Sequence, residues 1–236
     1  VKARDKQAGT GMLDLMAIVS HEMKSPVSAV HTTAETLYRG YLGNLDPEQQ
    51  KTVEKILRNC QYLEDIIRNY LDLSKMDLDN LESFAAKIHL VADVIQPVID
   101  VPENKDNLKK MPIVTDFAAR PKINGDPNLL NIVVTNLINN AIKYGKQETP
   151  VTVRLTEDEK SYIVSISNEG VGISKEDIEE RLFRKFSRLK QKGTEGVKGS
   201  GLGLYICKKI VEKHKGKIWA ESEVGKYVTF SFSLPK

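Results

Sequence analysis

The residues best suited to chemistry begin with His21 and Glu22, which stand side by side in a stretch with a helical pattern. On a helical wheel His21 points away from the apolar side of this stretch, so we expect an exposed imidazole ring. A neutral ring nitrogen is a competent nucleophile, and the neighbouring carboxylate is suited to orient the ring or accept its proton. Taken alone, a solvated surface pair is the commoner explanation.

Pro26 follows within the same helical stretch. A proline inside a helix removes a backbone hydrogen bond and crowds the carbonyl four residues back, here that of Glu22, at a cost of about 3 kcal/mol. A weak point beside an ionisable pair would loosen the helix and let the ring of His21 reposition.

A second polar group lies in "NLINNAIKYG", residues 136–145. Asn136 and Asn140 are four residues apart and share a helix face with Lys143. Neutral amide oxygens suit Mg²⁺, which keeps several waters and takes few protein ligands, and lysine supplies a point charge for phosphate. The alternative is an ordinary polar helix end. Two asparagines with a lysine and a tyrosine at this spacing argue against it.

Two glycine motifs follow, "NEGVGIS" at 168–174 and "GSGLGLYI" at 199–206. The first comes after an extended run; its glycines allow the backbone to approach a flat ligand, and Asn168 could hydrogen-bond a base. The second opens a helix, where free N–H groups bind phosphate. Its pattern is G-x-G-x-G with no strand directly before it, so a dinucleotide fold fits poorly. For either motif alone, an ordinary turn is an equally good explanation.

Between these motifs lies the basic segment "RLFRKFSRLKQKGTEGVKG". We expect Phe183 and Phe186 to be core residues, because aromatic residues at helical spacing usually are. The cations of this segment are more often a solvated surface than a site. A basic, glycine-broken segment before a phosphate-binding helix nevertheless suits a lid, which we assign to residues 190–198.

The first part of the chain supplies a helical hairpin. Apolar residues recur every three or four positions over 12–37, which predicts one helix. Asp46 is then a good N-cap and Pro47 a good first residue for a second helix, whose stripe runs over 53–73 and includes Cys60 as a core residue. Because an antiparallel hairpin buries little of these stripes alone, we predict a homodimer that forms a four-helix bundle.

The second part has the pattern of an α+β layer sandwich with a mixed sheet. Alternating extended runs predict strands at 112–117, 151–155, 162–167, 217–222 and 227–234. Helical patterns lie between them at about 91–100, where Pro97 interrupts the helix, and at 126–144, 175–183 and 202–215. We place the domain boundary so that residues 1–80 form the hairpin domain and residues 81–236 the sandwich domain.

Composition narrows the class of protein. A net charge of only +3 does not argue for nucleic acid as a partner. No apolar run approaches the ~20 residues of a membrane span, and no secretory signal opens the chain. Two cysteines are too few for a disulfide framework, so we expect reduced thiols and a cytoplasmic setting, either of a whole protein or of the cytosolic part of a larger sensor. No histidine shows zinc-ligand spacing; we expect His31 on a helix surface, His89 at the start of a strand and His214 at a helix end.

In this order the motifs resemble the catalytic core of a sensor histidine kinase, over about residues 12–235. "SHEMKSPV" resembles the phospho-acceptor box, and "NLINNAIKYG" the asparagine box. "NEGVGI" and "GSGLGLYI" are similar to the two glycine boxes, and "RLFRKFSRL" to the phenylalanine box. The resemblance implies a dimerisation and phosphotransfer hairpin followed by a Bergerat-type ATP-binding domain.

The resemblance also implies roles for the residues. His21 would be phosphorylated by ATP and would pass the phosphoryl group to an aspartate of a response-regulator receiver domain, with Glu22 as the base. Lys143 and Arg188 would neutralise charge on the transferring group. Contacts to the regulator would come from Ser25 and Ser28. The residues that would bind ATP are Asn136, Asn140, Tyr144, Asn168, Gly170, Gly172, Gly199, Gly201, Leu202 and Gly203, with Asn140, and Asn136 beside it, holding Mg²⁺.

Three positions depart from the family pattern. Asn168 replaces an aspartate that accepts a hydrogen bond from the adenine amino group; an amide oxygen also accepts one, so we expect ATP binding to survive at a cost on the order of 1 kcal/mol. Tyr227 replaces a glycine, for which we expect a local turn effect. Ser25 occupies a position that is often Thr or Asn in kinases that also dephosphorylate their partner.

The sequence is also consistent with two other functions, those of a scaffold and of a phosphatase. A catalytically weakened dimeric scaffold is favoured only by Asn168, and an enzyme that acts mainly as a response-regulator phosphatase would use Ser25 to position water. Relatives of the ATP fold that hydrolyse ATP place a glutamate where Asn136 stands, so transfer to histidine is chemically the better interpretation. Nucleotide affinity discriminates a kinase from a silent scaffold.

Overall fold

The computed structural model describes residues 22–76, 87–101, 110–189 and 199–236. These residues fall into two compact units, a helical hairpin and an α/β unit that begins at Lys87. His21, the predicted phospho-acceptor, and the predicted lid at 190–198 lie outside the described residues.

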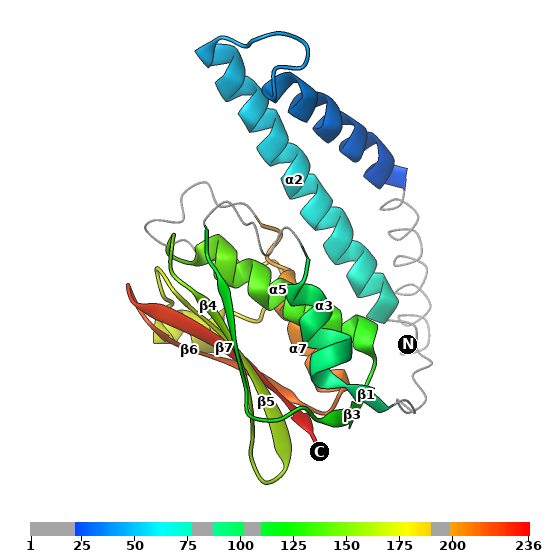
Figure 1. The fold of residues 1–236 in the computed structure, drawn as a ribbon, viewed down its shortest axis with the longest axis vertical. Helices are drawn as coiled ribbons and strands as arrows, with labels where there is room; N and C mark the ends of the chain where they lie inside the picture. Colours follow the sequence, from blue (N-terminus) through cyan, green and yellow to red (C-terminus); the bar gives the residue numbers. More distant parts are fainter. Residues whose placement is uncertain (1–21, 77–86, 102–109, 190–198) are drawn as a thin grey trace, which may run out of the picture. The chain divides into compact units, whose positions relative to one another are not determined.

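The hairpin consists of a helix over 22–38, a loop, and the helix α2 (Pro47–Met76) (Figure 1). Asp46 starts α2 as predicted: its Oδ1 accepts hydrogen bonds from the backbone N–H groups of Glu48 and Gln49 at 2.9 and 2.8 Å. The Gln49 side chain accepts in return from the Asp46 N–H at 3.0 Å. This reciprocal arrangement is a capping box, which satisfies N–H groups that the helix leaves unpaired. The first helix continues through Pro26.

In the described part of the hairpin, a strip of apolar side chains is buried between the two helices. Val27, Cys60 and Ile67 form a buried cluster there, so the predicted core position of Cys60 is confirmed. Other members of the two apolar stripes stay open to solvent: 42% of Met23, 52% of Val30 and 38% of Leu63 is exposed.

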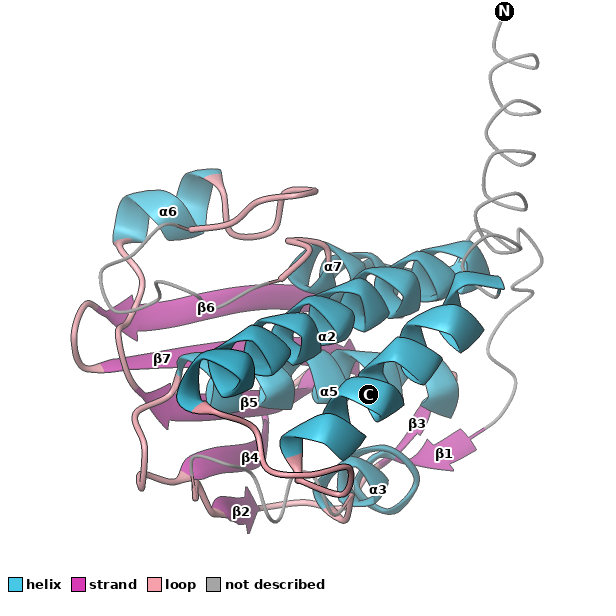
Figure 2. Ribbon diagram, turned by 90° about the horizontal axis from the view of Figure 1, so that it is seen from above, coloured by secondary structure: helices cyan, strands magenta, loops and turns pink. Residues whose placement is uncertain are grey.

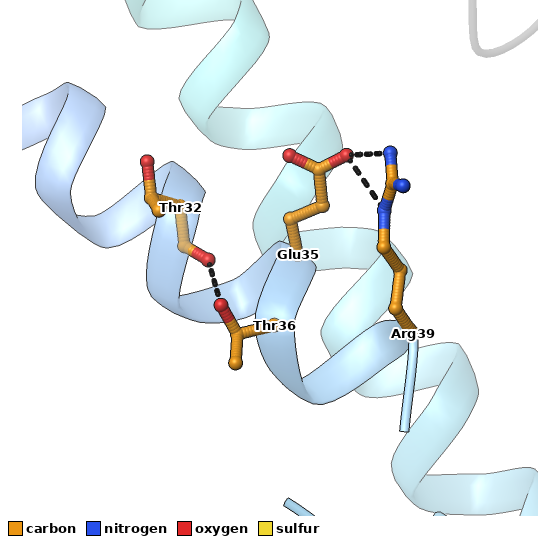
Figure 3. A network of polar contacts seen from close by, with 4 residues as sticks. All are labelled: Thr32, Glu35, Thr36 and Arg39. Atoms are coloured by element: carbon orange, nitrogen blue, oxygen red, sulfur yellow. Dashed lines mark hydrogen bonds and ion pairs between the residues drawn. The ribbon is translucent and has the colours of Figure 1, made fainter. Parts of the chain in front are cut away.

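Two polar contacts near the loop end of the first helix are local to that helix (Figure 3), whereas the Tyr38 hydroxyl donates to Glu54 of α2 at 3.2 Å. The Thr36 hydroxyl donates to the Thr32 carbonyl at 2.8 Å, and the Arg39 guanidinium pairs with Glu35 one turn earlier. Exposed i,i+4 pairs of this kind contribute little to stability.

The α/β unit is built on a five-stranded mixed sheet, as predicted. Its strand order is β2-β4-β5-β7-β6; β2 and β4 are parallel, and all other neighbours are antiparallel. The strands are β2 (Ile113–Phe117), β4 (Val151–Glu157), β5 (Ser161–Glu169), β6 (Lys217–Glu223) and β7 (Tyr227–Pro235).

Two helices, α5 (Pro127–Tyr144) and α7 (Gly203–Lys213), cover one face of this sheet and contact each other (Figure 2). Their apolar faces close the core: Leu137 and Ile210 are fully buried, as is Phe232 from the sheet. A short helix, α6 (Lys175–Glu180), is capped by Ser174, whose hydroxyl accepts from the Asp177 N–H at 3.2 Å.

The segment predicted as a helix over 91–100 is two helical pieces. A π-helical stretch, η1 (Leu90–Ile95), leads into α3 (Gln96–Ile99), and Pro97 stands at the start of the second piece. Proline has no N–H to donate, so the hydrogen-bond pattern changes where it enters the helix.

Three predictions need correction. A small sheet of β1 (Lys87–His89) and β3 (Lys122–Asn124) was not predicted, because three-residue strands carry too little alternation. His89 ends β1 rather than starting a strand. Phe186 is 62% exposed, not core, because α6 ends at Glu180 and the helical spacing that suggested burial does not continue to this residue.

Candidate functional site

The C-terminal end of α5 is joined to the end of β5. Gly145 and Gly170 form an isolated antiparallel bridge, and the Lys146 N–H donates to the Glu169 carbonyl at 2.7 Å. A side chain at Gly170 would place its Cβ 2.4 Å from the Tyr144 carbonyl oxygen. Only glycine permits so close an approach, which brings the asparagine motif against the first glycine motif.

Asn168 lies at this junction and is 2% exposed. Its Nδ2 donates to the Glu169 carbonyl at 2.9 Å, whereas its Oδ1 has no hydrogen-bond partner among the described residues. A buried acceptor without a partner is uncommon in folded proteins, so this oxygen is an unsatisfied acceptor at the junction of the two motifs.

The first glycine loop is laid against the turn between β6 and β7. Gly172 has a φ of +65°, and a Cβ there would lie 2.3 Å from the Glu223 carbonyl oxygen. The Gly170 and Gly225 N–H groups donate across this contact to the carbonyls of Lys226 and Val171 at 3.0 and 2.8 Å. Gly172 is therefore required first by packing and backbone conformation.

The asparagine motif also meets the second glycine motif. The Nδ2 of Asn136 donates to the Ile132 carbonyl at 2.9 Å, which leaves its Oδ1 directed away from the helix backbone. A Cβ at Gly203 would lie 2.6 Å from that oxygen. Asn140 and Lys143, one and two turns further along α5, are partly exposed.

The N-terminus of α7 has the character expected of an anion site. Its N-cap, Leu202, makes no side-chain hydrogen bond to the helix and is 1% exposed, so it packs in the core. The first N–H groups of the helix therefore have no side-chain cap, and they carry the positive end of the helix dipole. Gly199 is partly buried just before this turn.

The basic segment packs against the same turn. Gly201 has a φ of +71°, and a Cβ there would come within 2.7 Å of backbone atoms of Phe186 and Ser187. Burial raises the pKa of the Tyr144 hydroxyl, and the positive charge of Arg188 acts in the opposite direction. Lys185 lies with its Nζ 5.0 Å from the centre of the Tyr205 ring on α7.

The predicted residues of the α/β unit thus divide into a connected set and others. The contacts above link the end of α5 to the end of β5, Asn136 of α5 to the start of α7, and Gly201 to residues 186 and 187. The charge of Arg188 also acts on Tyr144. Glu22 and Ser25 are exposed on the 22–38 helix of the other unit. Two backbone contributors had no sequence signal: the Glu169 carbonyl orients Asn168, and the absence of a side chain at Gly145 makes room for Met111, whose Cε would lie 2.3 Å from a Cβ.

Within the described ranges, no group of three or more His, Cys, Asp or Glu side chains is placed to hold a metal. The amide pair on α5 is a different set of donors, of the neutral oxygen type that Mg²⁺ accepts. The helices of the described part include none long and apolar enough to cross a membrane.

Comparison with known protein families identifies the class of domain to which this α/β sandwich belongs. Residues 125–236 match the histidine kinase-, DNA gyrase B- and HSP90-like ATPase family. Residues 12–79 match the His Kinase A (phospho-acceptor) domain family. The chain belongs to the sensor histidine kinases and carries both domains of their catalytic core.

Relatives agree with this assignment. The sensor protein SrrB of Staphylococcus aureus (strain N315) is 30% identical over 224 residues, which are 94% of this chain and 38% of that protein. The chain therefore spans little more than a third of the length of this relative.

Solved structures show the same fold. Full-length ShkA, in complex with AMPPNP, aligns over 94% of this chain and 45% of its own, with a TM-score of 0.66 and 20% identity. The histidine kinase AdeS of Acinetobacter baumannii aligns over 91% of this chain and 97% of its own, with a TM-score of 0.58 and 20% identity. The catalytic domain of the histidine kinase ThkA covers 64% of this chain, with a TM-score of 0.55 and 27% identity.

Proposed function

We propose that the protein phosphorylates His21 with ATP and transfers the phosphoryl group to an aspartate of a response-regulator receiver domain. The observation that carries this proposal is a series of contacts: the end of α5 meets the end of β5, Asn136 of α5 meets the start of α7, and Gly201 meets Phe186 and Ser187, while the charge of Arg188 acts on Tyr144. Phosphoryl transfer depends on positioning and charge neutralisation, and this junction gathers the groups suited to both.

ATP would be held by groups from each linked segment. The Oδ1 of Asn168 would accept a hydrogen bond from the adenine amino group, and Tyr144 would pack near the nucleotide. The N–H groups at the start of α7 would bind phosphate oxygens, with Gly199, Gly201 and Gly203 keeping the backbone open to them. Gly170 and Gly172 would hold the loop that carries Asn168 in place.

The groups that act on the transferring phosphoryl lie on α5 and in the basic segment. Asn140, with Asn136 one turn earlier, would hold Mg²⁺, which when bound neutralises charge on the phosphates. Lys143 and Arg188 would add positive charge at the γ-phosphoryl group. Nothing at the position of Asn136 serves as a base for water, which favours histidine over water as acceptor.

The acceptor side of the reaction belongs to the hairpin. A ring nitrogen of His21 would form a bond to the γ-phosphorus as the bond to ADP breaks, and Glu22 would accept the ring proton. The phosphoryl group then passes to a receiver aspartate, which regenerates the neutral histidine. Residues 1–80 would carry this step and dimerisation, and residues 81–236 would bind the nucleotide.

The regulator would approach the exposed side of the hairpin near His21. Ser25 is exposed there, and the Ser28 hydroxyl donates to Glu64 of α2 at 3.4 Å, so both helices contribute to this surface. The same surface would serve dephosphorylation if Ser25 positions a water. The apolar residues left exposed on the hairpin support a homodimer in which a second copy covers them.

Incubation with γ-labelled ATP and Mg²⁺ tests the proposal, with acid-labile, alkali-stable phosphate as the signal. We expect label on the wild type, none on His21→Gln, and wild-type label on His31→Gln. His31 is a matched control because it is a partly exposed histidine on the 22–38 helix. Label that persists in His21→Gln would reject the assigned acceptor, and nucleotide binding without label in any form would support the scaffold.

A further inference from the structure

The side chain of Ser222, near the end of β6, ties the first glycine loop to the turn between β6 and β7. Its hydroxyl accepts a hydrogen bond from the Ile173 N–H at 2.8 Å and donates one to the Tyr227 carbonyl at 2.6 Å. One hydroxyl can accept and donate at the same time, so this group satisfies a donor on the loop and an acceptor on β7. Ile173 is buried, at 9% exposure, so loss of the hydroxyl would leave its N–H without this partner in a largely closed place.

Two further hydrogen bonds hold the loop on the turn, and both join backbone atoms. The Gly170 N–H donates to the Lys226 carbonyl at 3.0 Å, and the Gly225 N–H donates to the Val171 carbonyl at 2.8 Å. Substitution of a side chain removes neither of them. The bond of Ser222 is therefore the contact through which the sequence can strengthen or weaken the hold of the turn on the loop.

The bond of Ser222 also holds a different part of the loop. The two backbone bonds fix residues 170–171, directly after β5, whereas Ile173 stands just before Ser174, the N-cap of α6. Between them lies Gly172, with a φ of +65°. Glycine has the greatest backbone freedom of any residue, so fixing the chain on one side of it does not fix the other side.

We propose that Ser222 is a positioning residue for the nucleotide: its hydroxyl holds the first glycine loop on the β6–β7 turn in the form that binds ATP. This inference rests on the proposed function, because it takes the loop from Asn168 to Gly172 to be part of the nucleotide site. The groups assigned to the transferring phosphoryl, such as Lys143 and Arg188, lie on α5 and in the basic segment. Loss of the hydroxyl should therefore weaken ATP binding and leave the transfer step unchanged.

Ser233 offers a matched control at the other end of the same two strands. Its hydroxyl accepts a hydrogen bond from the Lys217 N–H at 3.1 Å, so it too satisfies a backbone donor. Like Ser222, it is partly buried. Ser233→Ala removes a comparable bond far along β7 from the glycine loop. Ser222→Thr is the conservative variant, because it keeps the hydroxyl and adds a methyl group that a strand tolerates well.

Calorimetric titration with ATP and Mg²⁺, and the dependence of labelling on ATP concentration, test the proposal on the full chain. Ser222→Ala should raise the dissociation constant and the KM for ATP about five- to tenfold and leave the rate at saturating ATP within about twofold of the wild type. Ser233→Ala and Ser222→Thr should keep wild-type values of all three quantities. A general loss of stability would give neither this split between KM and rate nor the rescue by threonine.

Wild-type affinity in Ser222→Ala, or an equal loss of affinity in Ser233→Ala, would overturn the role of Ser222 and leave the proposed function standing. If the wild type neither binds ATP nor becomes labelled, the proposed function fails and this inference fails with it.

Hydrogen exchange of the wild type decides the matter if Ser222→Ala does not fold. ATP with Mg²⁺ should slow exchange of the Ile173 and Gly225 N–H groups together, because the loop and the turn would open as one unit that the nucleotide holds closed. Exchange at Gly225 that ATP leaves unchanged would contradict the proposal.

Discussion

The two units of the protein reach stability by different means. In the α/β unit, side chains from both layers, such as Leu137, Ile166 and Phe232, are fully buried within one chain. In the hairpin, members of the apolar stripes are left open, with Val30 52% and Met23 42% exposed. The α/β unit therefore has a closed apolar core, whereas the described part of the hairpin leaves part of its apolar stripes exposed to solvent.

This difference places the two halves of the proposed reaction on unlike supports. The proposed nucleotide site needs fixed geometry, and it lies where backbone contacts such as that of Gly170 with Tyr144 leave no room to move. The acceptor hairpin has mainly local polar contacts on its surface, such as the Glu35–Arg39 pair (Figure 3). Its stability should therefore depend on a second copy, and that of the α/β unit should not.

The largest effect is expected from opening the closed core. Phe232→Ala should lower the free energy of unfolding of the α/β unit by about 3–5 kcal/mol, since it removes a fully buried ring. The fluorescence of Trp219, the single tryptophan of the chain, reports this transition because it lies in β6. Phe186→Ala is the control: the ring is 62% exposed and should cost less than about 1 kcal/mol.

Unfolding of the hairpin should depend on protein concentration, and unfolding of the α/β unit should not. The Trp219 transition should keep its midpoint over a wide range of concentrations, in the wild type and in Phe232→Ala. A Trp219 midpoint that rises steeply with concentration would contradict the independence of the α/β core.

A smaller effect is expected from placing a charge on the open stripe of the hairpin. Val30→Glu should raise the dissociation constant of the homodimer at least about tenfold, because a carboxylate would enter the surface that a second copy covers. Sedimentation equilibrium measures the constant. Val114→Glu is the matched control, because Val114 in β2 is 49% exposed, close to the 52% of Val30.

Equal dissociation constants for the two variants would mean that Val30 lies outside the dimer surface. If the wild type is monomeric at all concentrations, the predicted four-helix bundle is wrong.

A more local effect is expected where the asparagine motif meets the second glycine motif. Gly203→Ala would push its methyl group against the Asn136 Oδ1, and the expected result is about a tenfold loss of nucleotide affinity with little loss of stability. The side chain of Asn136 can shift, so the cost falls on its orientation. In the Asn136→Ala background the same substitution should cost much less, which a double-mutant cycle of nucleotide affinities measures. Additive losses would show that the two residues do not act together.

Much of this fold follows from local patterns in the sequence. The Asp46 cap, the stripes of the hairpin and the five alternating strands were predicted because each depends on neighbours along the chain. The strands β1 and β3 and the exposure of Phe186 were not, because they depend on where a short segment meets distant ones.

The site was predictable in its residue types and less so in its geometry. The motifs indicated which segments to bring together, but no sequence pattern states that the Glu169 carbonyl fixes the amide of Asn168. Likewise, Gly172 was expected at a ligand, and the structure gives it a packing role against Glu223. Backbone atoms are the same in every residue, so their contributions leave no signal in the sequence.

The smallest effect is expected from pH and should be confined to the α/β unit. His214 is 4% exposed at the end of α7; its Nε2 accepts from the Asp126 N–H at 3.1 Å, so its Nδ1 carries the proton and donates to the Ile210 carbonyl at 2.8 Å. Burial lowers the pKa of His214, the hydrogen bond to the Ile210 carbonyl and the nearby Asp126 raise it, and Lys213 lowers it further. Protonation would break the bond that joins the end of α7 to the start of α5, worth about 1 kcal/mol.

The direction in which the stability of the α/β unit changes with pH follows from this lowered pKa. The unfolded chain binds the proton first as pH falls below about 6.5, so the α/β unit should lose stability from there down to the folded-state pKa of His214. His214→Gln should remove this part of the slope of the Trp219 transition, because glutamine does not titrate. His89→Gln, an exposed histidine of the same domain, should keep the wild-type slope. If His214→Gln and His89→Gln both keep the wild-type dependence of stability on pH, that dependence belongs to other groups. The link between α5 and α7 would then be insensitive to pH.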